Sequence, residues 1–300
     1  MRMPAATLAL ALVATLAAPP ARAGDATGAF APYEDLLEVL GDLTWHLRDD
    51  VYRFPPPKDP TGHDLYRLAL LRLENWEKRY PGRLRDVTGY ARGEALERLG
   101  EYRKAANAYE QVSGQGSPLA EQARIARDRA ADFAGAADLP EQGPDVEGSL
   151  GALRAKLDAW AKVIERWHGT PYEPAALAEE ERLEEATSGL VVRNRRVLQD
   201  GDLTAEHALR FLIEKHADSR NLPAHIMQLG DLYADMAREY VEQHARPLAF
   251  EEDEFLRRAD RALDTYRKVA TWDGIREKPE AQGRFTAFDA YKATILARYR

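Results

Sequence analysis

The chain has 300 residues, of which 45% are hydrophobic and 31% are charged, and its formal net charge is −8 at pH 7. This composition is typical of a globular protein and excludes an intrinsically disordered chain. The acidic balance argues against binding to nucleic acid or to an anionic membrane surface. Because the chain has no cysteine, a disulfide framework, thiolate catalysis and a cysteine zinc site are excluded.

Residues 1–23 have the pattern of a cleavable signal peptide. A short basic start precedes an apolar run over residues 5–18, and residues 21–23 (Ala-Arg-Ala) match the cleavage motif. The run is shorter than the ~20 residues that span a bilayer. We expect a mature chain that begins at Gly24, without a transmembrane segment or a cysteine for lipid attachment, in the periplasm or secreted. An uncleaved membrane anchor is the alternative.

Two helices are predicted near the start of the mature chain. Residues 32–54 place leucines at helical spacing, and Leu40-Gly41-Asp42-Leu43 predicts a tight contact within this helix. Residues 55–63 are rich in proline and therefore form a loop. A second helix is expected over residues 65–80, with Asp64 as its cap.

Residues 86–118 predict a helix, a turn and a second helix. Small residues recur where the two helices have to touch, and Gly100 separates the two periodic runs. Ser117-Pro118 is expected to stop the second helix, since proline cannot continue it. The small residues are Gly93, Ala95, Ala105 and Ala108.

This unit of about 34 residues resembles the tetratricopeptide repeat. Gly93 occupies the small position of the family's first helix, and Ala105 and Tyr109 occupy the alanine and the aromatic position of its second helix. Leu96 and Val112 depart from the family pattern, which has tyrosine and alanine there.

The middle of the chain predicts a break followed by more helices. Residues 135–149 contain glycines and prolines and no aromatic residue, which is typical of a linker. We therefore expect a signal peptide at 1–23, helical repeats at 24–134, a linker at 135–149 and further repeats at 150–300. Helices are predicted at 119–134, 150–167, 173–189 and 190–200, with another capped by Thr204.

A second match to the repeat lies near residue 230. Leu229, Gly230 and Tyr233 fit the first helix of the family, and Leu229-Gly230-Asp231-Leu232 repeats the tetrapeptide at 40–43. The matching residues of the second helix, Ala262 and Tyr266, come about 20 residues later than the repeat requires. The first helix is therefore expected to continue to about His244, and a final helix over 280–298 to cap the array.

These patterns predict an all-α, right-handed solenoid of helical hairpins, with long irregular hairpins at both ends and a C-terminal capping helix. The resemblance is to bacterial periplasmic tetratricopeptide proteins of the Tol–Pal and outer-membrane assembly type. It implies a non-enzymatic scaffold of the cell envelope that binds a protein or peptide. Two alternatives are open: a peptidoglycan-processing enzyme or accessory factor, and a small-molecule binder that uses the tryptophans.

The resemblance also implies a binding groove, which in the family is lined by the first helix of each repeat. Positions at fixed offsets from Gly41, Gly93 and Gly230 carry acidic, apolar and aromatic side chains. Such a surface suits a partner with basic and apolar residues. An ordinary solvated acidic face is the alternative. The positions are Glu38, Asp42 and Trp45; Tyr90, Glu94 and Glu97; and Met227, Asp231 and Ala234.

No catalytic, metal or cofactor site is predicted. His207, His216 and His225 are nine residues apart, so on one ideal helix neighbours would face opposite sides. The acidic residues at 179–181 and 251–254 are expected on solvent-facing surfaces, although paired carboxylates can serve acid–base chemistry when one is buried. The five tryptophans are expected mainly in the core.

Overall fold

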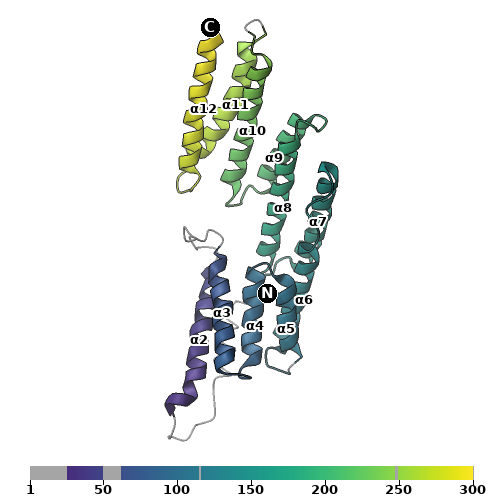
Figure 1. Cartoon of the computed structure of the whole chain (residues 1–300), viewed down its shortest axis with the longest axis vertical. Helices are drawn as coiled ribbons and strands as arrows, with labels where there is room; N and C mark the ends of the chain where they lie inside the picture. Colours follow the sequence, from purple (N-terminus) through teal and green to yellow (C-terminus); the bar gives the residue numbers. More distant parts are fainter. Residues whose placement is uncertain (1–25, 50–61, 115, 247–248, 300) are drawn as a thin grey trace. The chain divides into compact units, whose positions relative to one another are not determined.

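The computed structural model of the chain describes residues 26–49, 62–114, 116–246 and 249–299, which form helices and no strand (Figure 1). The all-α prediction is therefore confirmed for these residues. No helix among them is both long and apolar enough to cross a membrane. The predicted signal peptide and residues 55–61 of the predicted loop lie outside the described ranges.

The described ranges contain eleven helices. Consecutive helices pack against each other within two sets, α2 to α6 and α8 to α12. Their bounds are α2 Ala26–Asp49, α3 His63–Arg79, α4 Arg85–Arg98, α5 Tyr102–Ser113, α6 Ala120–Ala137, α7 Val146–Trp167, α8 Glu173–Asn194, α9 Gly201–Lys215, α10 Leu222–Gln243, α11 Glu252–Ala270 and α12 Lys278–Tyr299.

The chain divides into two compact units. Unit 1 comprises Met1–Leu139 and Glu165–Pro171, and unit 2 comprises Pro140–Ile164 and Tyr172–Arg300. The end of α7 belongs to unit 1 because Arg166 and Trp167 both donate to Asp132 on α6, at 2.6 and 2.9 Å. The first boundary falls between α6 and α7, within the segment predicted as a linker.

The hairpin α4–α5 is built around one close contact. Gly100 turns the chain with φ of 73°, a conformation that glycine adopts without strain. A Cβ atom on Gly93 would lie 2.4 Å from the ring of Tyr109, so only glycine permits this approach. Ala105 is fully buried in the same unit. The predicted tight packing between these two helices is confirmed.

The hairpin α10–α11 repeats this contact. A Cβ atom on Gly230 would lie 2.6 Å from the ring of Tyr266. Tyr266 comes late in the sequence, but its ring reaches Gly230 because α10 continues to Gln243 before the chain turns back. The predicted extension of this helix is therefore confirmed.

Gly41 differs from the other two glycines. Leu40 and Leu43 are buried, but a Cβ atom on Gly41 would meet no atom of the described residues within 4 Å. The prediction of a tight contact at this point is wrong, because only the leucines of the tetrapeptide turn towards the core. The glycine faces away from it.

Several predicted helix ends are also corrected. The second helix of the central hairpin ends at Ser113, before Ser117-Pro118, where Gly116 has φ of 64°. The segment 190–200 is no separate helix, because α8 runs unbroken to Asn194. Asp64 and Thr204 lie inside the first turns of their helices, and the N-cap positions are taken by Gly62 and Asp200.

Candidate functional site

The predicted groove residues on α2 share one face of the hairpin α2–α3. The carboxylates of Glu38 and Asp42 accept hydrogen bonds from Arg72 on α3, at 2.7 and 2.5 Å. Trp45, one turn further along, is 66% exposed. A role for these three residues in binding a partner stays a prediction.

The predicted groove residues on α4 are held in contacts between helices. Tyr90 is buried against the ring of Tyr109, with 5.2 Å between ring centroids. Glu97 accepts a hydrogen bond from the Tyr109 hydroxyl at 2.8 Å and two from the buried Arg129 of α6, at 2.9 and 2.6 Å. These side chains stabilise unit 1 and offer little surface to a partner.

Glu94 is an acid in an unfavourable setting. Its Oε2 atom is buried and has no hydrogen-bond partner among the described residues. Burial, followed by the nearby carboxylate of Glu97, raises the pKa of Glu94 to about 8. The neutral form therefore predominates at neutral pH, which removes it from the set of negative charges predicted for the groove.

On α10 the predicted residues are also used internally. Met227 and Ala234 lie in the core of unit 2. Asp231 accepts a hydrogen bond from the Tyr266 hydroxyl at 2.7 Å and pairs with Arg284 of α12. Burial and the bond to Asp231 raise the pKa of Tyr266. Of the nine predicted positions, those on α4 and α10 thus serve mainly to join helices.

The acidic stretch of α8 is not the solvated face that the sequence predicted. Glu181 is buried and accepts hydrogen bonds from Ser219 at 2.6 Å and from the ring of His225 at 2.8 Å. Burial acts to raise the pKa of Glu181, but these two bonds together with the charges of His225 and His216 outweigh it and lower the pKa. The prediction is wrong because α8 packs this side against the connection between α9 and α10 and against the first turn of α10.

The same connection explains two of the histidines. His216 contacts Glu184 at 2.5 Å while His225 contacts Glu181, so both point towards α8. The prediction that they face opposite sides assumed one continuous helix, whereas the chain turns between Lys215 and Leu222. Within the described ranges, no three histidine, aspartate or glutamate side chains are arranged to hold a metal ion.

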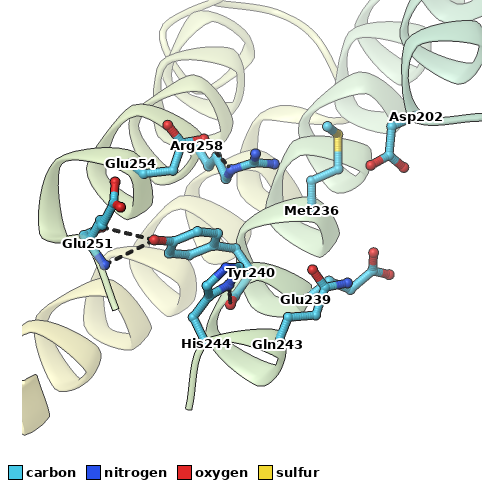
Figure 2. Close-up of a pocket in the computed structure, with 9 residues that line it drawn as sticks. All are labelled: Asp202, Met236, Glu239, Tyr240, Gln243, His244, Glu251, Glu254 and Arg258. Carbon is cyan, nitrogen blue, oxygen red and sulfur yellow. Dashed lines mark hydrogen bonds and ion pairs between the residues drawn. The ribbon is translucent and has the colours of Figure 1, made fainter. Parts of the chain in front are cut away.

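Unit 2 contains a polar hollow that sequence reasoning missed. It lies between the turn before α9 with the first residues of that helix (195–203), the second half of α10 (236–244) and the start of α11 (251–258), and we call it the acidic groove. Figure 2 shows the part of the groove between Asp202, α10 and α11. Two adjoining hollows of about 340 and 620 Å³ make up the groove and share Asp202, Glu239 and Gln243.

The walls of the acidic groove are held by specific contacts. Arg195, only 8% exposed, donates to Asp202 at 2.5 Å and also to Glu239. The Tyr240 hydroxyl accepts from the backbone N–H of Glu251 at 3.0 Å, as Figure 2 shows. These bonds join the α8–α9 turn and the start of α11 to α10, so the groove is preformed.

The turn at the mouth of the groove has demanding backbone geometry. Asp200 has φ of 50°, in the left-handed region that residues with a Cβ atom rarely adopt. A Cβ atom on Gly201 would lie 1.7 Å from the carbonyl oxygen of Arg195, so the turn requires glycine there. The Asp-Gly-Asp sequence at 200–202 is typical of a turn, but it does not indicate what the turn faces.

Negative charge in the groove exceeds the positive charge available to neutralise it. Arg195 and Arg196 are bound to Glu239, and Arg258 is bound to Glu254 at 2.7 Å. Three further carboxylates are exposed and have no hydrogen bond or ion pair within the described part of the chain. They are Asp200, Glu242 and Glu251.

Comparison with known proteins gives no family assignment. No protein-family model matches the chain, and no curated protein matches it.

Proposed function

We propose that the chain is a non-enzymatic, tetratricopeptide-like scaffold that binds a protein or peptide partner. The observation that supports this most is the acidic groove of unit 2. Its hydrogen-bonded walls and its exposed carboxylates, Asp200, Glu242 and Glu251, suit lysine or arginine side chains of a partner. The groove differs from the one predicted from the repeat pattern, whose residues on α4 and α10 are largely occupied.

The binding test uses charge reversal at exposed positions. Changing Asp200, Glu242 and Glu251 together to lysine should weaken binding of a short lysine-rich peptide by about tenfold or more, because each lost attraction becomes a repulsion. A matched control changes three other exposed acids of unit 2 that have no ion pair among the described residues, Asp158, Asp218 and Asp289, to lysine. Fluorescence anisotropy measures both affinities.

Equal loss of binding in the two triple variants would mean that net charge and not the groove attracts the peptide. The residues of the earlier prediction are unsuitable for this purpose. Lysine at Glu97 or Asp231 would face a paired arginine, Arg129 or Arg284, and would destabilise the fold before any effect on binding was seen. Clear lysis of peptidoglycan by the purified chain would contradict the non-enzymatic part of the proposal.

We also propose that the scaffold is exported and acts in the cell envelope. The support is the sequence pattern of residues 1–23, with its apolar run and its Ala-Arg-Ala motif. N-terminal sequencing of the protein from a periplasmic or secreted fraction should give a chain that begins at Gly24. A retained leader would contradict this location.

A further inference from the structure

The outer face of α9 carries large apolar side chains. Leu203 and Phe211 are 55% and 56% exposed, and Val197 in the preceding turn is 77% exposed. Leu203, His207 and Phe211 follow one another at four-residue intervals, so they form one line along the helix, about 12 Å long. The opposite face is fully used, because it packs on α8 and α10 through Ala205, Leu209 and Leu212.

The positive charges beside this line are already paired. Arg210 is bound to Glu206 at 2.9 Å, and Lys215 is bound to Glu184 at 2.6 Å and to Glu180 at 2.9 Å. Their charges are therefore compensated from within unit 2.

Three carboxylates near the two ends of the line have no ion pair among the described residues, in contrast to the paired Glu206 and Asp202. Glu214 follows Phe211 by three residues and is exposed, and Asp200 and Glu242 share the acidic groove with Leu203. None of these three carboxylates has a hydrogen bond or ion pair within the described residues. An apolar line with free carboxylates at both ends is complementary to apolar side chains flanked by cations.

We propose that the outer face of α9 (Leu203, His207, Phe211 and Glu214), together with Val197 of the preceding turn, binds an amphipathic helix with a basic flank. Apolar side chains of the bound helix cover Leu203 and Phe211, and its lysines or arginines pair with Asp200, Glu214 and Glu242. The inference rests on the proposed function and names the class of partner for the same end of unit 2.

A helix fits this surface better than an extended peptide. The backbone groups of α9 are bonded within the helix, so no strand edge is available for an added strand. A bound helix satisfies its own backbone and presents side chains at intervals of three and four residues, which match the spacing along α9.

The test uses a synthetic amphipathic helix of about 18 residues, long enough to be helical when bound, with leucines on one face and lysines on the other. The variant V197S/L203Q/F211Q removes the apolar line without touching the core. We expect it to bind the peptide about tenfold or more weakly than the unchanged chain does. The matched control is L68Q/L71Q/L177Q, which removes three other exposed leucines and should bind as the unchanged chain does.

A scrambled peptide of the same composition, without an apolar face, should bind more weakly than the amphipathic one. Three results would each overturn the inference: no binding of the amphipathic peptide, equal binding of both peptides, or equal affinities in the variant and its control. A concentration-dependent dimer that is lost in V197S/L203Q/F211Q would also overturn it by assigning the face to a second copy of the chain.

The same two variants distinguish a failure of the α9 inference from a failure of the proposed function. If charge reversal at Asp200, Glu242 and Glu251 weakens the peptide while V197S/L203Q/F211Q does not, the groove binds a basic segment that does not use α9. If neither change weakens the peptide, both proposals are wrong.

Discussion

The hairpins α4–α5 and α10–α11 make the same contact at very different spacings along the chain. In each, a tyrosine ring of the second helix packs on a glycine of the first, Tyr109 on Gly93 and Tyr266 on Gly230. Tyr266 follows its glycine at more than twice the spacing of Tyr109. The added length of α10 and the start of α11 supply most of the acidic groove. The candidate site therefore lies where the chain departs from the regular repeat.

The two hairpins also differ in how the tyrosine hydroxyl is used. Each hydroxyl donates to a carboxylate that also pairs with an arginine from the next helix of its unit, Glu97 with Arg129 and Asp231 with Arg284. The Arg129 side chain is 3% exposed, whereas that of Arg284 is 35% exposed. The same cluster is buried in unit 1 and partly solvated in unit 2, which predicts unequal energies.

The largest destabilisation is expected at the two glycines. Gly93→Ala or Gly230→Ala places a methyl group against a buried tyrosine ring that has no room to move, at a cost of about 2–3 kcal/mol of unfolding free energy. Urea denaturation followed by circular dichroism measures both variants. An unchanged midpoint for either one would mean that its glycine–tyrosine contact is absent in solution.

The tyrosine hydroxyls should separate the two hairpins. Tyr109→Phe leaves Glu97 with one bond fewer in a buried site and should cost about 1–2 kcal/mol, because bonds to charged groups are the strong ones. Tyr266→Phe should cost less than about 1 kcal/mol, since water can replace the bond to the half-exposed Asp231. Equal losses in thermal unfolding would contradict the difference in burial.

Glu94 makes the stability of unit 1 depend on pH. The raised pKa, about 8, means that the folded state keeps a proton that the unfolded state releases above about pH 4.5, so stability falls as pH rises from 4.5 to 8. Glu94→Gln removes this loss and should be more stable than the unchanged chain by roughly 3–5 kcal/mol at pH 8.5, with no gain at pH 4, because a pKa difference of one unit is worth about 1.4 kcal/mol. A gain of the same size at both pH values would show that Glu94 titrates normally.

The smallest effect has the opposite sign. Gly41→Ala fills open space on α2 and should raise the unfolding free energy by about 0.5–1 kcal/mol, because alanine favours the helix. Gly41 and Gly230 lie in two copies of the tetrapeptide Leu-Gly-Asp-Leu, so the two alanine variants form a matched pair. Destabilisation by Gly41→Ala would show that α2 makes a contact there after all.

Sequence patterns predicted the helices and the contacts that depend on spacing within a helix. The periodicity gave the helical hairpins, and the small residues at Gly93, Ala105 and Gly230 marked true contact points because a close approach of helices needs a missing or small side chain. The late position of Tyr266 correctly indicated a longer α10. Gly41 shows the limit, since a small residue also occurs where nothing approaches it.

The candidate site could not be predicted in the same way. Glu181 was assigned to solvent because acidic residues usually are, but its partners are Ser219 in the connection between α9 and α10 and His225 at the start of α10, both far along the chain. The acidic groove depends on Arg195 joining Asp202 to Glu239, a contact between three segments that no periodicity encodes. Which acidic side chains are paired and which are exposed therefore depends on contacts between segments far apart in the sequence.

The most direct test of the account is the salt dependence of binding to the amphipathic lysine–leucine peptide. For the unchanged chain, affinity should fall steadily between low and physiological salt, because exposed carboxylates attract the lysines through a screened field. The D200K/E242K/E251K variant should bind weakly with little salt dependence, whereas V197S/L203Q/F211Q should bind weakly with the dependence retained. Equal salt dependence in the unchanged chain and the charge-reversed variant would contradict the acidic groove as the partner site.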